Sequence, residues 1–391
     1  MAATRGRVIA IDQDEAIVRC AEFRALAPSH RKVAHPGGWR VGQFVDVDSG
    51  LPIDSRAPAG DYPPPDSEVM RMSDRRMHAL VVRGALRTIV RDFFTERDFL
   101  EVETPLLVPS PGLEIHLDAV PAGGGFLITS PEYQMKRLLA AGFERIYQVC
   151  KCFRANERGA HHSSEFTMIE WYRAFSTIDA IREDTEQLVH AVCGDTATVG
   201  ARAIAVKPPW RRITVRDAVR TWVGIEIDGD EPASELVRKV RAAGIEVADD
   251  CAWDDAFFAA FLSRVDPALA ALDHAIFVED WPAPLAALAR RKDGDRRTAL
   301  RFEAYIGGIE LANAFDELID PDEQRARFLD DQRIRAERGK SVYPLDEKLL
   351  AALAEGLPPS AGIALGFDRL VMLATGAASI DQVLTFTGDE L

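Results

Sequence analysis

The sequence predicts an α+β fold in which helices pack around a largely antiparallel sheet. Strand-like segments outnumber those that a doubly wound βαβ sheet would need, and many of them are joined by hairpin-like loops. Two phosphate-binding patterns of parallel nucleotide-binding folds, GxxxxGK[ST] and a strand-linked GxGxxG, do not occur. The chain has 391 residues and is 47% apolar, which is enough for a large buried core.

The first part of the chain is predicted to be a small β-rich segment over residues 1–49. Residues 6–21 contain two β-branched runs around an Asp/Gln turn, and a third strand is expected at 43–47. A segment of this size is marginal on its own. Residues 50–71 are predicted as a linker, because five prolines and two glycines fall between residues 50 and 66. One large domain is then expected over residues 72–391.

Helices and strands are expected to alternate through this large domain. Ser73-Asp74 can cap a long helix that extends to about Arg97. Further helices are expected at 132–141, 177–193, 321–338, 346–356 and 368–375, with a mixture of helices and loops at 214–274. Strands are expected at 99–103, 126–129, 145–153, 165–173, 274–278, 299–305, 308–311 and 363–366.

Charge and composition exclude several classes of protein. The net charge is −15, which does not suit a protein that holds nucleic acid by bulk charge. No apolar run approaches the ~18 residues of a membrane span, and the first residues contain no signal-peptide core. Five cysteines without paired spacing fit a reducing compartment. A cytoplasmic protein without a membrane segment is therefore expected.

A charged hairpin between residues 149 and 172 is the first candidate for chemistry. It concentrates charged and imidazole side chains within one strand–loop–strand unit: Arg154, Glu157, Arg158, His161, His162, Glu165 and Glu170. Arginine binds anions and an aromatic face can recognise a base, so the hairpin suits a nucleotide. The alternative is a hairpin whose charges are simply solvated.

Acidic residues spaced seven apart form a second candidate. Glu303, Glu310 and Glu317 would form a solvated stripe on a helix, but Gly307-Gly308 interrupts any helix here. The carboxylates are therefore expected on separate strands or loops, beside apolar strand residues. Converging carboxylates need a partner, and a hard divalent cation carrying phosphates is a natural one. Ordinary surface charge is the alternative.

A third candidate lies where a strand of small residues turns into an apolar helix, over residues 362–373. Arg369 stands at the start of that helix, where it opposes the helix dipole. An anion bound at this position would compensate, and the neighbouring glycines would allow close approach of a ligand. An arginine that faces solvent is the alternative.

Taken in order, these segments resemble motifs 2 and 3 of the class II aminoacyl-tRNA synthetases, in the subclass that includes lysyl-tRNA synthetase. Motif 1 also fits, because a long helix leads to Phe99-Leu-Glu-Val-Glu-Thr-Pro105, which ends in the family's dimer-interface proline. The resemblance covers residues 72–387. It implies the antiparallel synthetase sheet flanked by helices, use of ATP and Mg²⁺, and a homodimer.

The chain looks most similar to the elongation factor P lysyltransferase family, a synthetase paralogue without an anticodon-binding domain. The segments that carry this resemblance start at Thr129, Glu165, Gly308 and Ala364. Ser130-Pro-Glu132 and Ala364 follow the paralogue, where lysyl-tRNA synthetases tend to have Ala-Pro-Glu and Gly. The added methyl group at Ala364 fits a preference for β-lysine over α-lysine, as in that family. The predicted acceptor is a lysine of elongation factor P.

The resemblance assigns a role to each matching residue. Arg154 and Arg369 are the catalytic arginines, on the α-phosphate with the substrate carboxylate and on the γ-phosphate, and Glu303 and Glu310 hold magnesium. The predicted nucleotide site is Arg154, Glu157, His162, Phe166 and Arg369. The predicted amino-acid site is Ser130, Glu132, Glu170, Tyr172, Asn313, Glu317 and Ala364.

The chain departs from the family pattern at a few positions. Asn156 replaces the usual motif 2 glutamate, and Glu157 follows it, so the contact to the adenine amino group could fall to Glu157 or to the backbone. The β-rich residues 1–49 are too short for a full anticodon-binding barrel. Three alternatives stay open: a lysyl-tRNA synthetase, a ligase that acts on another amine, and a non-catalytic regulatory paralogue. The acidic charge and missing barrel make tRNA the less favoured acceptor.

Overall fold

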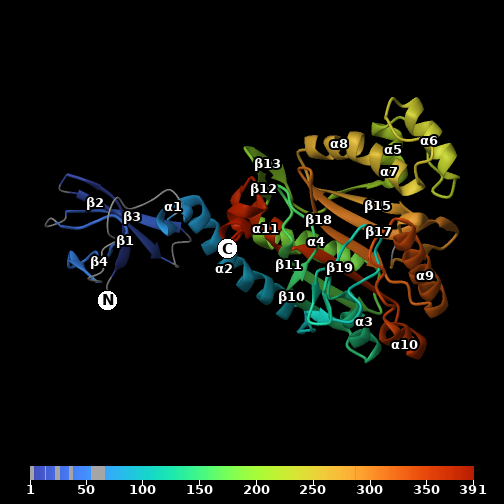
Figure 1. The fold of residues 1–391 in the computed structure, drawn as a ribbon, viewed down its shortest axis with the longest axis horizontal. Helices are drawn as coiled ribbons and strands as arrows, with labels where there is room; N and C mark the ends of the chain where they lie inside the picture. Colours follow the sequence, from blue (N-terminus) through green and yellow to red (C-terminus); the bar gives the residue numbers. More distant parts are fainter. Residues whose placement is uncertain (1–3, 14, 23–26, 35–37, 54–66, 287) are drawn as a thin grey trace. The chain divides into compact units, whose positions relative to one another are not determined.

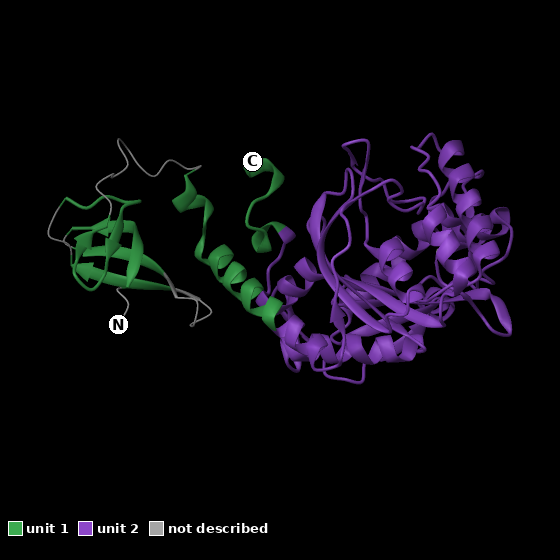
Figure 2. Cartoon of the chain, turned by 90° about the horizontal axis from the view of Figure 1, so that it is seen from below, with its two compact units in different colours: residues 1–88, 381–391 green, residues 89–380 purple. Residues whose placement is uncertain are grey.

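The computed structural model describes residues 4–13, 15–22, 27–34, 38–53, 67–286 and 288–391. Its contacts divide the chain into two compact units, which Figure 2 shows in different colours. The first unit comprises Met1–Thr88 with Asp381–Leu391, and the second comprises Ile89–Ile380. The domain boundary expected at residue 72 stays a prediction.

The first unit contains a five-stranded antiparallel sheet in the order β3-β2-β1-β4-β5. Its strands are β1 Arg5–Asp12, β2 Glu15–Glu22, β3 Ala27–Ala34, β4 Phe44–Asp46 and β5 Leu51–Pro52. A small core lies around Val8, Val18 and Val45, which are not exposed to solvent. The segment predicted as a linker carries β5 and α1 (Glu68–Arg71) at its ends, and residues 54–66 lie outside the described residues.

A nine-stranded, mostly antiparallel sheet forms the centre of the second unit (Figure 1). Its order is β14-β15-β17-β18-β19-β11-β10-β6, with β16 paired to β17. The strands are β6 Leu100–Glu101, β10 Arg145–Phe153, β11 Glu165–Ala174, β14 Arg211–Thr214, β15 Ile276–Pro282, β16 Arg291–Lys292, β17 Asp295–Ile306, β18 Ile309–Asp316 and β19 Ser360–Gly366. Two smaller sheets join β7 Leu107–Val108, β9 Gly125–Leu127 and β8 Pro121–Ala122, and β12 Thr196–Val199 with β13 Arg202–Ala205.

Helices cover this sheet and supply its core. α4 contacts β18 and β19, and α11 contacts β11 and β18. Phe94 of α2 stacks on Tyr147 of β10, with ring centroids 4.3 Å apart. The helices are α2 Asp74–Thr95, α3 Glu132–Ala140, α4 Ile178–Cys193, α5 Val215–Trp222, α6 Ala233–Ala242, α7 Trp253–Ala260, α8 Asp266–Ala271, α9 Pro321–Glu337, α10 Glu347–Gly356 and α11 Phe367–Thr375. No helix in the described ranges has the length and apolar character needed to cross a bilayer.

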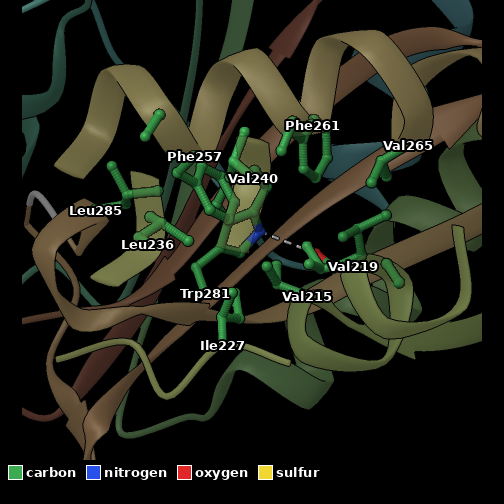
Figure 3. Close-up of a cluster of buried hydrophobic side chains, with 14 of the residues drawn as sticks. Val215, Val219, Ile227, Leu236, Val240, Phe257, Phe261, Val265, Trp281 and Leu285 are labelled. Atoms are coloured by element: carbon green, nitrogen blue, oxygen red, sulfur yellow. Dashed lines mark hydrogen bonds between the residues drawn. The ribbon is translucent and has the colours of Figure 1, made fainter. Parts of the chain in front are cut away.

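The helices α5 to α8 form a subdomain with its own apolar core. Figure 3 shows Phe257, Phe261 and Val265 above Trp281 of β15, whose indole N–H donates to the carbonyl of Val278 at 3.1 Å. α7 continues into a short π-helix at Phe261–Val265 before α8 begins. The expected mixture of helices and loops at 214–274 is thus a subdomain packed against the edge of the sheet.

The α+β prediction is confirmed, and the differences lie at weakly patterned strands. β3 was not expected, since residues 27–34 lack apolar alternation; it forms by pairing with β2 at the edge of its sheet, where Pro28 costs no central hydrogen bond. The strand expected at 99–103 is reduced to β6, Leu100–Glu101. The strands expected at 274–278 and 363–366 extend to β15 and β19, because ladder pairing continues beyond their apolar runs.

Candidate active site

One cavity of about 870 Å³ in the second unit is lined by every residue that the family resemblance assigns to the nucleotide, metal or amino-acid site, whereas Arg158 and Glu165 of the charged hairpin do not line it. The cavity lies on one face of the large sheet. Alternate residues of β11, namely Phe166, Met168, Glu170 and Tyr172, all line it, as the two-residue period of a strand requires. The predicted site residues come from segments of the chain as far apart as Ser130 and Arg369, and the fold brings them into one site.

The register of four neighbouring strands explains this convergence. Glu303 of β17 pairs with Asn313 of β18, Asn313 pairs with Ala364 of β19, and Ala364 pairs with Glu170 of β11. Directly paired residues on adjacent strands project from the same face of a sheet. A single row across the sheet thus carries one predicted metal ligand and three predicted amino-acid contacts.

Arg154 follows β10 and lies at the predicted nucleotide end of the cavity. Its guanidinium lies over the ring of Phe166, 5.1 Å from the centroid, and Nη1 is 3.8 Å from Oε1 of Glu157. Its Nε is buried and has no hydrogen-bond partner among the residues that the structure describes. A buried guanidinium donor without a partner fits an anionic ligand such as a phosphate or a carboxylate.

Arg369 approaches the same end of the cavity from the start of α11. It donates from Nη2 to Nε2 of His162 at 2.8 Å, from Nε to the carbonyl of His161 at 3.2 Å, and from Nη1 to the carbonyl of Glu310. Burial and the charge of Arg369 lower the pKa of His162, so its ring is neutral and accepts this bond. The preceding residue, Asp368, accepts from the N–H of Thr167 at 2.6 Å and fixes the helix start to β11.

Glu303 and Glu310 project from β17 and β18. Tyr305 donates to Oε2 of Glu303 at 2.6 Å and Arg301 donates to Oε1 at 2.5 Å, and Arg301 also donates to Asn313 at 3.1 Å. Burial, and next the nearby charge of Glu310, raise the pKa of Glu303 to about 7. Two carboxylates that repel each other in this way fit a divalent cation, which would relieve the repulsion.

The other end of the cavity holds three glutamates, two of which contact a buried lysine. Lys136 of α3 places its Nζ 2.6 Å from Oε1 of Glu132 and 2.6 Å from Oε2 of Glu317. Lys136 is 2% exposed and Glu317 is 1% exposed. Burial raises the pKa of Glu317 to about 8, although Lys136 acts in the opposite direction.

Glu170 lies on the sheet beside these residues. It accepts from the hydroxyls of Ser130 and Tyr172, each at 2.7 Å. Ser130 also accepts from the N–H of Glu132 at 3.1 Å, which ties the start of α3 to β11. Burial, and next the charge of Glu132, raise the pKa of Glu170 to about 8. This acidic, hydroxyl-lined end is chemically suited to an alkylammonium group.

Gly362 of β19 makes room for Tyr172, its partner on β11. A Cβ atom at Gly362 would lie 2.2 Å from Cε1 of Tyr172 and 2.9 Å from Oε1 of Glu317. The absent side chain therefore lets the phenol ring and the carboxylate lie directly against the strand. The family resemblance did not single out this glycine.

The departure at Asn156 has a structural reason. Asn156 adopts a φ of 63°, in the left-handed region where asparagine is enriched and a glutamate would be strained. The chain turns there, and the next residue, Glu157, lines the cavity. Its contact with the adenine amino group stays a prediction.

Sequence reasoning missed several polar residues of the cavity and its floor. Arg301 bridges the predicted metal and amino-acid contacts, Lys136 bridges Glu132 and Glu317, and Glu114 and Asp331 line the wall near α9. Burial raises the pKa of Glu114, and it raises that of Asp331 to about 7. Lys136 had a signal, since it is four residues after Glu132 in a predicted helix.

Comparison with known proteins defines the class to which this fold and cavity belong. A family model described as tRNA synthetases class II (D, K and N) matches residues 66–390. Proteins named elongation factor P--(R)-beta-lysine ligase are similar over 79% of this chain and 95% of their own length. Those of Enterobacter sp. (strain 638), Klebsiella pneumoniae (strain 342) and Histophilus somni (strain 2336) are 41%, 39% and 38% identical.

The chain therefore belongs to the class II tRNA synthetase family and, within it, to the family of these ligases. The resemblance drawn from motifs 1 to 3 is confirmed. The roles of the individual site residues stay predictions, because the comparisons name no residues.

Proposed function

We propose that this protein uses ATP to activate a lysine, with β-lysine preferred over α-lysine, and transfers the lysyl group to a lysine side chain of elongation factor P. The activated intermediate is an aminoacyl-adenylate. The enzyme is an AMP-forming ligase and acts in the cytoplasm. No disulfide joins its five cysteines, all of which the structure describes, and this supports a reducing compartment.

The proposal depends on one observation: the two ends of a single cavity carry side chains of opposite charge. One end holds Arg154 and Arg369, and the other end holds Glu132, Glu170 and Glu317. The same cavity can therefore accept the phosphates and carboxylate of a reacting pair at one end and a substrate ammonium at the other. A tRNA-charging enzyme or a ligase for another amine would share this arrangement, so the acceptor is what the experiment must determine.

In the first step the substrate carboxylate attacks the α-phosphorus of ATP and pyrophosphate leaves. This displacement needs positioning and neutralisation of charge more than it needs a protein base. Arg154 would hold the attacking carboxylate and the α-phosphate, Arg369 and His162 the outer phosphates, and Phe166 the adenine. Arg154 and Phe166 already lie within contact distance in the structure.

Glu303 and Glu310 would hold magnesium, which neutralises phosphate charge when it is bound. Among the described residues, no three histidine, cysteine, aspartate or glutamate side chains lie close enough together to hold a metal ion by themselves. Water and phosphate oxygens would therefore complete the coordination, as is usual for Mg²⁺. Arg301 and Tyr305 would keep the Glu303 oxygens oriented.

At the amino-acid end, Glu317 and Tyr172 would pair with the distal ammonium of the substrate. Glu132, Glu170, Ser130 and Asn313 would hold the rest of the polar groups. Ala364 lies between Asn313 and Glu170 in the cross-strand row, so its methyl group narrows the floor of this end of the cavity. This narrowing supports the preference for β-lysine.

The test is the intact mass of elongation factor P after incubation with this protein, ATP, Mg²⁺ and β-lysine or α-lysine. A lysine tRNA charging assay runs in parallel. We expect elongation factor P to gain one β-lysyl increment and the tRNA to stay uncharged. Charged tRNA with unmodified elongation factor P would identify a synthetase instead. Pyrophosphate release without modification of either acceptor would indicate a ligase for another amine.

We also propose that the protein is a homodimer that uses the motif 1 region. Leu100, Leu106 and Leu107 are 49%, 36% and 48% exposed, and β6 is the edge strand of the large sheet. Exposed apolar side chains on an edge strand and in the segment that follows it support an interface at this place.

A further inference from the structure

Lys136 lies beneath the amino-acid end of the cavity and contacts two of its glutamates. Its ammonium is 2.6 Å from Oε1 of Glu132, one turn earlier on α3, and 2.6 Å from Oε2 of Glu317, which follows β18. All three side chains are buried. Lys136 does not line the cavity, so its role cannot be direct contact with a bound ligand.

The two oxygens of Glu317 have different surroundings. Oε2 faces Lys136, whereas Oε1 is buried without a hydrogen-bond partner among the described residues. Oε1 lies beside Gly362 and Tyr172, which line the cavity, since a Cβ on Gly362 would be 2.9 Å from it. The ion pair with Lys136 therefore leaves one carboxylate oxygen turned toward the cavity.

The charge balance of this cluster depends on Lys136. The charge of Glu132 raises the pKa of both Glu170 and Glu317, the charge of Glu170 also raises that of Glu317, and Lys136 opposes this effect at Glu317. A buried carboxylate that loses its cation either binds a proton or is strongly destabilised in its charged form. A protonated Glu317 would have lost the charge that attracts an ammonium group.

We propose that Lys136 is a positioning residue for the amino-acid substrate: its ammonium holds Glu132 in place, favours the charged form of Glu317, and turns Oε1 of Glu317 toward the substrate ammonium. This inference rests on the proposed function and adds a residue that it does not include. Lys136 sets the strength and pH dependence of amino-acid recognition, and it leaves ATP binding and the reacting groups untouched.

The test compares Lys136→Met with the wild type in amino-acid-dependent ATP–pyrophosphate exchange. KM for β-lysine and KM for ATP are measured separately between about pH 6.5 and 9.5, the range in which raised carboxyl pKa values are crossed. Lys239→Met is the matched control, because Lys239 pairs with Glu235 at the same i, i+4 spacing (3.0 Å) on α6, and no residue of α6 lines the cavity. Thermal unfolding of each variant checks that it is folded.

For Lys136→Met we expect KM for β-lysine to rise about tenfold or more near neutral pH, because each pKa unit changes the ionised fraction tenfold. The pH above which KM for β-lysine falls should move upward. KM for ATP should stay unchanged. Glu132→Gln in the Lys136→Met background should move this pH back down, because it removes a charge that raises the pKa of Glu317. Lys239→Met should match the wild type.

Two results would overturn the inference. One is a folded Lys136→Met enzyme whose KM for β-lysine and pH profile equal those of the wild type. The other is a uniform loss of kcat with unchanged pH profile, which would indicate a purely structural role. A wild-type enzyme that shows no lysine-dependent exchange would instead contradict the proposed function, so the two failures are distinguishable.

Discussion

A single missing side chain shapes the amino-acid end of the cavity. Gly362 lets the Tyr172 ring lie against β19, where a Cβ would come within 2.2 Å of Cε1 and 2.3 Å of Cδ1. Gly362→Ala should therefore displace the ring and its hydroxyl from Glu170. We expect KM for β-lysine to rise about tenfold or more, the effect of ~1–3 kcal/mol of lost contact, with KM for ATP unchanged in pyrophosphate exchange.

Gly84→Ala provides the control for this substitution. Gly84 lies in α2, and a Cβ there would meet nothing within 4 Å. Alanine should stabilise that helix slightly and leave both KM values as in the wild type. An unchanged KM for β-lysine in Gly362→Ala would show that Tyr172 does not contact the substrate.

The raised carboxyl pKa values predict that substrate binding releases protons. Glu170 and Glu317, with pKa values of about 8, are mostly protonated in the empty cavity near neutral pH. Pairing with an ammonium requires the charged form, so binding at about pH 7 expels protons and affinity rises toward about pH 8.5. Calorimetry in two buffers of different ionisation enthalpy should give different binding enthalpies. Equal enthalpies in both buffers would contradict these protonation states.

The same pKa values fix the sign of a stability effect. The folded chain binds more protons at Glu170 and Glu317 than the unfolded chain, whose glutamates titrate near 4.3. These two groups therefore lower the free energy of unfolding as the pH rises from about 4.3 to 8.

Residue types within motifs could be predicted from the sequence, whereas their supporting partners could not. Arg154, Glu310 and Arg369 stand in recognisable local contexts, and all three line the cavity. Arg301 and Gly362 act through residues on neighbouring strands. Arg301 donates to Asn313 on β18, and Gly362 makes room for Tyr172 on β11. No local pattern encodes such a partner, so the sequence alone places both residues within motif segments but does not predict the contacts that they make.

At the scale of an element, α9 fixes one wall of the cavity through Arg335. This side chain is 0% exposed and donates to the carbonyls of Ser341, Glu114 and Leu117 and to the carboxylate of Asp118, at 2.7 to 2.8 Å. Glu114 and Leu117 belong to a loop that lines the cavity. Arg335→Met should lower the free energy of unfolding by about 3 kcal/mol or more, because several buried acceptors lose their donor.

Arg333 on the same helix offers a matched comparison. It pairs with Asp330 and Glu337, but its side chain is 56% exposed. Arg333→Met should change stability by less than about 1 kcal/mol, as is usual for surface pairs. Denaturant titration of both variants measures the difference. Equal, small losses would show that the Arg335 contacts do not hold the loop.

Elements with a strong pattern were predicted closely, and elements formed by pairing were not. β10 spans Arg145–Phe153 as predicted, because its apolar and polar residues suit a central strand. β3 and β6 depend on the strands beside them, since β3 is an edge strand and β6 has only two residues. Pairing with a distant strand is a tertiary effect that local propensity does not contain.

At the scale of the whole molecule, strand order brings the site together. The row Glu303–Asn313–Ala364–Glu170 needs β17, β18, β19 and β11 as neighbours, although β11 precedes β17 by more than a hundred residues in the chain. Charge and periodicity predicted the strands but not this order. The family resemblance implied an antiparallel synthetase sheet, and the order of its strands is seen in the structure.

The assembly state gives the last prediction at this scale. Leu106 and Leu107 are exposed a few residues after the edge strand β6, next to the segment that resembles the dimer motif. We expect light scattering at micromolar concentration to give twice the chain mass of 43.1 kDa.

Leu106→Glu with Leu107→Glu should give the monomer, because charges at an apolar interface lose their hydration without gaining a partner. Leu329→Glu is the control, since Leu329 is 51% exposed on α9 and should leave the dimer intact. A wild-type mass of one chain would exclude the dimer. A dimer in the double variant would place the interface elsewhere.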